Sequence, residues 1–507
     1  MCCASFATEA LACAKDRVGV NFHRSKDLNA GVGMPDEYSG KARRFVRRTQ
    51  IITLLWLLVI AGGALAARVF IYPAHGQIAV RNQGFVPYAD EPINYRSNNL
   101  SDPIAKLQKR IDSGQVTLNY EPTHSYLKSI LEQLNIPISS QTLVFSKTSF
   151  QYKKISPQTP RALYFNDDVY VGWVHDGKEL EVISFDPMQG AIYYLLDAEK
   201  ADHPAFKRAE LDCTQCHIAA GTHNVPGVLL RSIYPKPTGT QAPKSTSFIT
   251  GQESPLKDRW GGWYVTGTSG QQLHMGNEVV QDPEHPEVLN RAAGANVLDL
   301  SSRFDTSAYL SGSSDIVAHL VLAHQTQMHN LITLTNYQAR IALHSETAKS
   351  KPISALPDEV RQQYQRPADE LVRYMLFTNE APLDEPIKGN AGFAEQFAAL
   401  GPRDARGRSL RDFDLHKRIF KYPCSYLIYS ESFDSLPEPA KSYVYHRIFE
   451  VLTGQEQGTE FATLSSADRR AILEILLATK PGLPDEWRQY AKQAHLETLL
   501  PGHKRRG

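Results

Sequence analysis

Hydrophobic and polar positions alternate with a short period in one part of the chain, between residues 161 and 199. Four runs rich in β-branched and aromatic residues follow one another there, separated by Asp, Gly and Pro: 162–167, 169–177, 179–187 and 190–198. Short runs of this composition between turn residues are typical of strands. The pattern predicts an antiparallel meander in this part of the chain, and the segment 261–270 predicts one further strand with its turn.

From about Ala292 onward, apolar residues recur at the three- and four-residue spacing of a helix. The longest such segment is 314–343, and three shorter ones follow it at 358–377, 438–454 and 465–480. Ser465 and Asp468 match a capping box at the start of the last segment. Apolar positions at this spacing predict helices. The expected fold class is therefore α+β, with a β-rich segment followed by a mostly helical C-terminal half.

One run of the chain is apolar without interruption. Residues 51–67 carry no charged side chain, and four arginines precede them within residues 43–48. The run is long enough for a short membrane-spanning helix or for the core of a signal peptide. Basic residues mark the cytoplasmic end of such a helix, so the chain after it is expected on the exported side. We predict an uncleaved N-terminal membrane helix over 51–72, and Ala64-Leu65-Ala66 leaves cleavage as the alternative.

The composition narrows the classes of protein to consider. A chain of 507 residues is expected to form two or three folded units, with enough core to enclose a large cofactor. Its 55 Lys and Arg nearly balance its 54 Asp and Glu, and the resulting net charge of +1 argues against a nucleic-acid-binding surface. The sequence contains no Gly-rich phosphate loop and no nucleophile elbow, so neither a nucleotide-dependent enzyme nor a hydrolase is indicated.

The candidate chemistry centres on a C-x-x-C-H sequence formed by Cys213, Cys216 and His217. Such cysteines occur in redox-active pairs, in structural zinc sites and in covalent haem attachment sites. A redox pair of the thioredoxin type needs a long helix after the motif, and residues 221–227, with two glycines and a proline, would end such a helix early. A zinc site needs four ligands, and the expected exported part of the chain has only one further cysteine, Cys424. The sequence therefore favours haem attachment.

Haem attachment gives each residue of the motif a role. The sulfurs of Cys213 and Cys216 would form thioethers with the two vinyl groups of haem c, and His217 would bind the iron through one imidazole nitrogen. Bacteria attach haem in this way on the outer side of the energy-coupling membrane, where the predicted anchor places the motif. Only one such motif occurs in the chain, so a single covalent haem is expected.

The stretch CTQCHIAAGTHNVPGVLLRS, from Cys213 to Ser232, resembles the haem region of class I c-type cytochromes. In that family, a proline after the haem histidine brings a backbone carbonyl to the second N–H group of the imidazole, and this bond orients the ring as an iron ligand. By resemblance, Pro226 and the glycine after it would have this role. Arg231 is then a candidate partner for a haem propionate, or else a solvated arginine.

Most of the expected exported chain is similar to a group of large, membrane-anchored bacterial proteins with a cytochrome c domain. The segments that carry this similarity are 182–197, the haem motif, 254–277, 314–332 and 407–437. The resemblance implies a haem and an exported location on the cytoplasmic membrane, and it brings no reaction with it. Together with the patterns above, it gives these expected regions: a cytoplasmic tail over 1–50, the anchor over 51–72, a β-rich exported region over 73–200, a cytochrome c-like haem region over 201–290 and a helical region over 291–507.

The iron ligand opposite His217 decides what such a haem can do. Met275 is the first candidate, because it lies 58 residues after His217 and next to a glycine that allows close approach of the backbone. Its neighbour His274 is an alternative ligand. His324 and Met328 lie four residues apart on one predicted helix, so they share a face, and they are reserve candidates. A last possibility is that no side chain of the protein fills this position.

Two functions are compatible with these expectations. A methionine or histidine in the sixth position gives a closed iron site, which is typical of electron transfer between redox partner proteins. An open sixth position would permit a haem enzyme, such as a peroxidase or an oxygenase, and the large size of the chain is in its favour. We expect a membrane-anchored c-type cytochrome that transfers electrons on the exported side, with the haem enzyme as the alternative. Its expected partners are a redox protein and the membrane.

Overall fold

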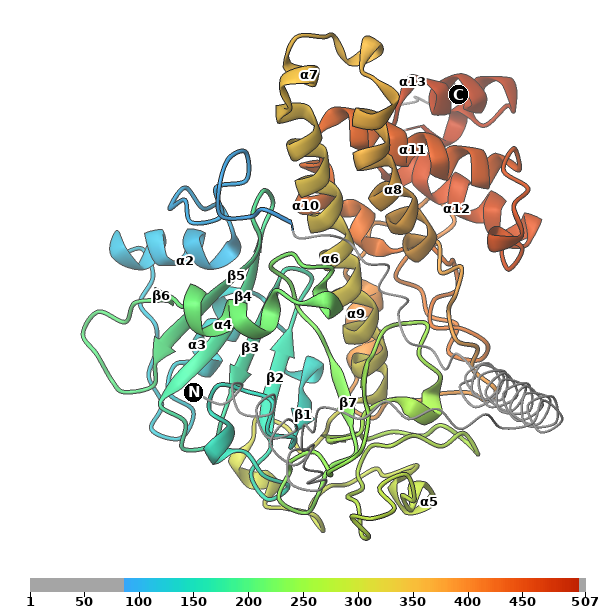
Figure 1. The fold of residues 1–507 in the computed structure, drawn as a ribbon. Helices are drawn as coiled ribbons and strands as arrows, with labels where there is room; N and C mark the ends of the chain where they lie inside the picture. Colours follow the sequence, from blue (N-terminus) through green and yellow to red (C-terminus); the bar gives the residue numbers. More distant parts are fainter. Residues whose placement is uncertain (1–85, 501–507) are drawn as a thin grey trace, which may run out of the picture. The chain divides into compact units, whose positions relative to one another are not determined.

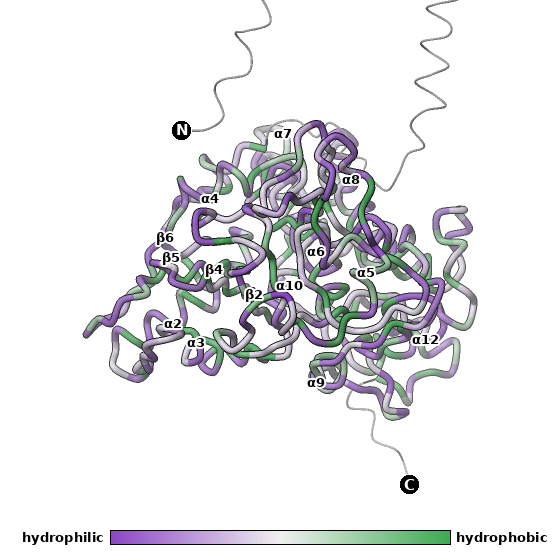
Figure 2. Tube along the Cα trace, turned by 90° about the horizontal axis from the view of Figure 1, so that it is seen from below, coloured by the Kyte–Doolittle hydropathy of each residue, from purple (hydrophilic) through white to green (hydrophobic). Residues whose placement is uncertain are grey.

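The computed structural model describes residues 86–500. The described residues belong to one compact unit, 74–507. The predicted membrane helix over 51–72 and the predicted tail before it lie outside the described residues. Between residues 86 and 500, none of the helices combines the length and the apolar character needed to cross a lipid bilayer. Along the trace, hydrophobic and hydrophilic residues are instead closely mixed (Figure 2).

The described part of this unit is built around a seven-stranded antiparallel sheet (Figure 1). Its strands, in spatial order, are β6 (Lys207–Arg208), β5 (Gly190–Asp197), β4 (Glu179–Asp186), β3 (Val169–Trp173), β2 (Arg161–Phe165), β1 (Thr142–Val144) and β9 (Trp263–Tyr264). Strands β2 to β5 are consecutive in the chain and pair with their sequence neighbours, so they form the predicted meander. Two further strands, β7 (Arg231–Ile233) and β8 (Ser247–Ile249), pair with each other.

Helices surround the sheet and make up most of the regular structure after residue 290. The helices of the described residues are α2 (Pro103–Asp112), α3 (Leu127–Gln133), α4 (Glu210–His217), α5 (Arg291–Gly294), α6 (Ile316–His344), α7 (Glu346–Lys349), α8 (Asp358–Met375), α9 (Phe393–Ala399), α10 (Glu431–Asp434), α11 (Glu438–Thr453), α12 (Ser466–Thr479) and α13 (Asp485–Gln493). Figure 1 shows α6 between the sheet on one side and α8, α11 and α12 on the other. This helix therefore joins the sheet to the helical C-terminal half.

The length and burial of α6 follow from its sequence. Asp315 caps its N-terminus, because its carboxylate accepts hydrogen bonds from the backbone N–H groups of the second and third residues after it (2.8 and 3.3 Å). Most residues of the helix are buried, including its polar ones, so these need hydrogen-bond partners inside the protein. Gln325, for example, donates to the hydroxyl of Tyr170 in β3 (2.8 Å). Such bonds fix the helix to the sheet in one register.

The two faces of the sheet have different neighbours. On one face, Tyr194 of β5 donates a hydrogen bond to Asp102 (2.8 Å), and Ser184 of β4 accepts one from the backbone of Ile104 (3.3 Å), so α2 is fixed there. Tyr193 points to the opposite face, because successive residues of a strand alternate. We call this second surface the Tyr193 face.

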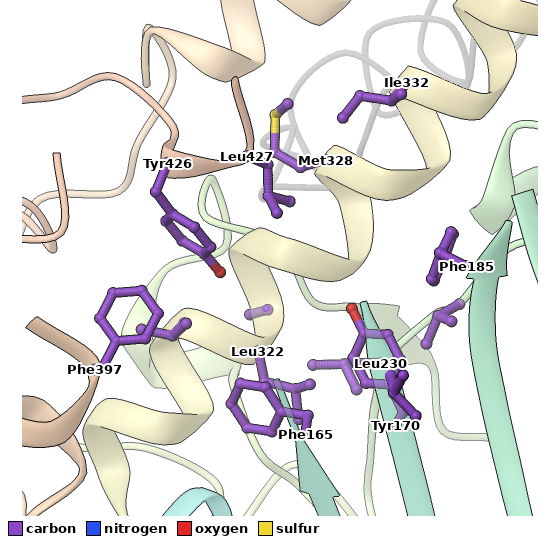
Figure 3. Close-up of a cluster of buried hydrophobic side chains, with 14 of the residues drawn as sticks. Phe165, Tyr170, Phe185, Leu230, Leu322, Met328, Ile332, Phe397, Tyr426 and Leu427 are labelled. Carbon is purple, nitrogen blue, oxygen red and sulfur yellow. The ribbon is translucent and has the colours of Figure 1, made fainter. Parts of the chain in front are cut away.

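A cluster of buried side chains fills the space between the Tyr193 face, α6 and the C-terminal half (Figure 3). Its members include Phe165, Tyr170 and Phe185 from the sheet, Leu322, Met328 and Ile332 from α6, and Phe397, Tyr426 and Leu427 from later segments. The main hydrophobic core of the described residues is one connected cluster from Val86 to Ala491. The regions expected at 73–200, 201–290 and 291–507 therefore share a single core.

The α+β fold class predicted from the sequence is confirmed. The four predicted strand runs correspond to β2, β3, β4 and β5, and the four predicted helices correspond to α6, α8, α11 and α12. The capping box of Ser465 and Asp468 is also present, with side chain to backbone hydrogen bonds in both directions (3.1 and 3.3 Å). The strand predicted within 261–270 is only two residues long and lies beside β1 at the edge of the sheet.

The turn between β2 and β3 contains Asp168, whose carboxyl group is buried and lies near other acidic side chains. Burial raises the pKa of Asp168 to about 7, and the negative charges of Asp167 and Glu431 act in the same direction. The folded chain therefore keeps a proton on Asp168 up to about pH 7, whereas the unfolded chain loses it near pH 4. Stability is consequently lost as the pH rises from about 4 to about 7, and the loss is complete above this range.

We expect the Asp168→Asn variant to be more stable than the wild type at pH 8, by up to about 4 kcal/mol, and equally stable at pH 4. Asparagine cannot ionise, so the variant avoids the cost of a buried carboxylate. Urea unfolding at both pH values measures the difference. Asp176→Asn changes an exposed aspartate in the next turn and should alter stability little at either pH. A gain of the same size at pH 4 and at pH 8 would contradict this explanation.

Candidate functional site

The three residues of the C-x-x-C-H sequence lie on α4, which crosses the Tyr193 face of the sheet over β5 (Figure 1). None of the residues of α4 is fully buried, and Leu211 is 70% exposed. After His217 the chain turns sharply. The hydroxyl of Thr222 lies within hydrogen-bonding distance of the carbonyl oxygens of His217 and Val225 (3.2 and 2.9 Å). The early end of this helix, which the sequence predicts, is therefore confirmed.

The two thiols of the motif are free in this structure and differ in exposure. Cys213 is half-buried and packs against the hydrophobic core, whereas Cys216 is exposed. Burial, together with the negative charges of Glu181 and Asp212, raises the pKa of Cys213 to about 12. Redox-active C-x-x-C pairs depend on a lowered cysteine pKa, so this environment does not favour thiol–disulfide exchange.

His217 is held in one orientation by the backbone that follows the motif. Its Nδ1 donates a hydrogen bond to the carbonyl oxygen of Gly227 (2.9 Å), and the N–H of Gly227 donates to the carbonyl of His217 (3.1 Å). The hydroxyl of Tyr193 donates to the same Gly227 carbonyl (2.9 Å), and the rings of Tyr193 and His217 are 5.2 Å apart. Burial lowers the pKa of His217 and so favours its neutral form. Within the described residues the Nε2 atom forms no hydrogen bond, which leaves it the lone pair that a metal ligand needs.

The segment after the motif is fixed from two sides. Asn330 of α6 accepts a hydrogen bond from the N–H of Val228 (3.0 Å) and donates one to its carbonyl (2.7 Å). On the sheet side, the carbonyl of Pro226 accepts a hydrogen bond from Ala191 of β5 (3.3 Å). Gly227 has no room for a side chain, because a Cβ would lie 2.2 Å from Oδ1 of Asn330. The carbonyl that orients the imidazole is thus that of Gly227, one residue after Pro226.

Beside α4, the Tyr193 face carries a row of partly exposed side chains. Cross-strand pairing aligns Leu163 of β2, Gly172 of β3, Glu181 of β4 and Leu195 of β5 in this row. Leu163, Glu181 and Leu195 are half-buried, and so is Ile183, which lies in the next row. Four apolar positions, Leu163, Gly172, Ile183 and Leu195, therefore form a shallow surface next to the motif, which we call the sheet floor.

One arginine lies on the sheet floor. The guanidinium of Arg161 occupies the space above Gly172, where a Cβ would lie 2.4 Å from one of its nitrogens. It pairs with Glu181 (2.6 Å), and Glu181 also accepts hydrogen bonds from Ser149 (2.7 Å) and Gln151 (3.0 Å). The Nε atom of Arg161 is buried and has no hydrogen-bond partner among the described residues. The guanidinium is therefore held in place with one donor unused.

These residues together fit a haem. Arg161 lies over Gly172, whose neighbours along the row are Glu181 of β4 and Leu195 of β5, the strand that α4 contacts. Two free thiols, an oriented imidazole, an apolar surface and an unpaired cationic N–H group meet at one place. A haem requires the first three, and its propionates or an anion on its iron would satisfy the fourth.

Met275 and His274 are packed at a different place. Met275 is fully buried, and its sulfur accepts a hydrogen bond from the hydroxyl of Ser232 (3.7 Å). Nδ1 of His274 accepts a hydrogen bond from the N–H of Gly276 (3.1 Å), and burial lowers the pKa of His274 to about 4. Both side chains therefore have neighbours that account for their burial without a metal.

Positions along α6 show how far this loop lies from the motif. Trp260, whose ring is 5.1 Å from that of His274, lies beside His319 of α6 (5.6 Å). Asn330, which contacts the segment that orients His217, is eleven residues farther along the helix, or about 16 Å. A metal ion holds its ligand atoms at about 2 Å. In this structure, the loop of His274 is not in position to share a metal ion with His217.

His324 and Met328 lie in the core on the other side of α6. Nδ1 of His324 forms a hydrogen bond with Gln252 (2.6 Å) and its Nε2 forms one with Ser425 (2.8 Å), so both ring nitrogens have partners. Met328 is fully buried in the cluster of Figure 3. It lies two residues from Asn330, and residues two apart point to opposite sides of a helix. Neither candidate is therefore directed toward the motif.

We expect the Met275→Leu variant to leave the absorption spectrum of the haem-loaded protein unchanged, with and without carbon monoxide. Leucine keeps the apolar volume, so the free energy of unfolding should fall by less than about 1.5 kcal/mol. Met375→Leu, at another fully buried methionine, is the matched control. A spectrum that changes, or new carbon monoxide binding in Met275→Leu alone, would identify Met275 as an iron ligand and refute this expectation.

Arg161, Tyr193 and Asn330 are the neighbours of the motif that sequence reasoning missed. No local pattern marks any of them, because they reach the motif through strand pairing or through the course of α6. The arginine singled out from the sequence, Arg231, lies exposed at the start of β7. Its backbone pairs with Ile249 of β8, and its carbonyl accepts a hydrogen bond from Nε1 of Trp263 (2.9 Å).

Comparison with known proteins adds no further constraint. No family model, no curated protein and no solved structure matches this chain. Among residues 86–500, no group of three or more His, Cys, Asp or Glu side chains is arranged to hold a metal ion.

Proposed function

We propose that this chain is a c-type cytochrome that carries one covalent haem and transfers electrons to a redox partner protein. In this proposal Cys213 and Cys216 hold the haem, His217 binds its iron through Nε2, and a membrane helix over 51–72 anchors the chain in a bacterial cytoplasmic membrane, with the 74–507 unit on the exported side. One observation carries the proposal. The hydrogen bond from Nδ1 of His217 to Gly227 orients the imidazole and leaves Nε2 for a metal.

The surrounding residues suit electron transfer. A haem bound here supplies a one-electron iron couple. The carbonyl of Gly227 and the hydroxyl of Tyr193 hold the imidazole, and the sheet floor presents apolar side chains beside it. The exposure of α4 leaves the attachment side accessible to a partner protein.

A haem enzyme, such as a peroxidase or an oxygenase, is the second candidate, and one observation favours it. Strands β2, β3, β4 and β5 contain no histidine and no methionine. The sheet floor therefore offers neither of the side chains that usually close the sixth position of a cytochrome iron.

Haem staining of the full chain after denaturing electrophoresis tests the attachment. The chain is produced in a bacterial host that attaches haem c, and the expected result is a stained band with one haem per chain. Folded protein without stain, or a haem that acidic organic solvent removes, would refute covalent attachment.

The topology has a separate test. Protease added to spheroplasts should degrade the 74–507 unit and leave a tag at the N-terminus protected. Protection of the 74–507 unit would contradict the exported location.

A further inference from the structure

We infer that the sixth position of the iron is open to a small exogenous ligand at the sheet floor, and that Arg161 donates a hydrogen bond to that ligand. The inference rests on the covalent haem of the proposed function and names the ligand class of the same site. The ligands are anions of one to three atoms on ferric iron and neutral diatomic molecules on ferrous iron.

Among the described residues, the surface beneath α4 has no protein side chain that would compete for the sixth position of the iron. Both attachment sulfurs and His217 lie on α4, which crosses the Tyr193 face. Strands β2 to β5 below it contain neither histidine nor methionine. The same is true of residues 145–160, the connection whose Ser149 and Gln151 reach Glu181 at the floor. These four strands and this connection therefore supply no conventional sixth ligand.

The candidate iron ligands predicted from the sequence lie in other parts of the structure. Met275 and His274 lie with Trp260 at the level of His319, far along α6 from the motif. His324 and Met328 lie in the core, and both ring nitrogens of His324 are hydrogen-bonded. Each of these side chains is already packed or hydrogen-bonded where it lies, so none of them gains a missing partner by moving to the iron.

The guanidinium of Arg161 cannot easily swing away, because it lies against Gly172 and is paired with Glu181, which two further donors hold. Its Nε is nevertheless buried and unpaired within the described residues. A buried donor without a partner is unfavourable, and a bound anion would satisfy it with a charge-assisted hydrogen bond. The residue therefore favours anions over neutral ligands.

Two probes on the haem-loaded full chain test the inference by absorption spectroscopy: carbon monoxide on the reduced protein and cyanide on the oxidised protein. The wild type should bind both. Arg161→Leu should bind carbon monoxide within about twofold of the wild-type affinity but cyanide at least about tenfold more weakly, because the cationic donor is lost. Arg161→Lys should restore part of the cyanide affinity. Arg110→Leu, at an exposed arginine of α2 on the opposite face, should match the wild type.

The outcomes distinguish failure of haem attachment from failure of the open sixth position. Absence of a haem stain in the wild type refutes the proposed function itself. A stained protein that ignores carbon monoxide refutes only the open position, and the variants His203→Ala and Met188→Leu then show whether one of these exposed side chains fills it. Equal cyanide affinity in the wild type and Arg161→Leu would remove Arg161 from the ligand site.

A second variant keeps the test decisive if Arg161→Leu does not fold. Glu181→Gln leaves the arginine in place and removes the carboxylate that partly neutralises it. Cyanide affinity should then rise several-fold, because the guanidinium charge acts on the anion without compensation. An unchanged cyanide affinity in a folded, haem-stained Glu181→Gln protein would overturn the role of Arg161.

Discussion

Replacing Cys213 and Cys216 together with alanine should abolish the haem stain of the denatured chain. No thioether can form in the double variant, so any haem that enters the site is lost when the chain unfolds. Each single variant should keep a reduced stain, because one thioether remains possible. The fold should survive these changes, since Cys213 is half-buried and Cys216 is exposed. The measurement is stain intensity per amount of protein, together with the intact mass of the chain.

Cys424→Ala provides the matched control for this experiment. Cys424 is a fully buried thiol in the C-terminal half, and burial raises its pKa to about 12. Its removal should leave the stain at the wild-type level. Persistent stain in the double variant, or loss of stain in Cys424→Ala with the motif intact, would overturn the assignment of the two motif cysteines.

The Asn330→Ala variant should lose about 2–4 kcal/mol in free energy of unfolding. The amide of Asn330 is the hydrogen-bond partner of both backbone groups of Val228, and its removal leaves a buried N–H and a buried C=O unsatisfied. The effect should reach the motif, because Val228 follows the glycine whose carbonyl orients His217. Urea unfolding measures the loss, and amide hydrogen exchange at Val228 should become faster than in the wild type.

Thr326→Ala is the control on the same helix. Thr326 is equally buried, but among the described residues its hydroxyl bonds only to a carbonyl of its own helix (3.2 Å), so its removal leaves no other described segment without a partner. Its cost should stay below about 1 kcal/mol. Similar losses in both variants would show that Asn330 contributes only to the helix and does not hold the segment after the motif.

Local sequence patterns were sufficient for much of the fold. The spacing of apolar residues over many positions predicts α6 and the strands β2 to β5, and each of these elements is present. The C-x-x-C-H sequence is itself local, so Cys213, Cys216 and His217 could be singled out at once. The absence of a long helix after the motif could also be predicted, because glycine and proline follow it closely.

The rest of the site depends on contacts that no local pattern encodes. Leu163 and Leu195 share a row only because three strand pairings are in register, and a shift by one residue in any of them would turn one leucine away. Arg161 reaches the motif through the same register. The choice of Met275 rested on its spacing from His217, but between these residues the chain forms β7, β8 and β9 and ends near the opposite part of α6.

The way His217 is held has a consequence for how this protein can be divided. The carbonyl that orients its ring belongs to residue 227, the hydroxyl that supports that carbonyl belongs to residue 193, and the amide that fixes the next residue belongs to residue 330. A fragment cut at 201 and 290 would contain the attachment sequence but neither of its two outer supports. The cytochrome character proposed here therefore does not reside in a transplantable module, and it can be inherited or engineered only together with the sheet before it and the long helix after it.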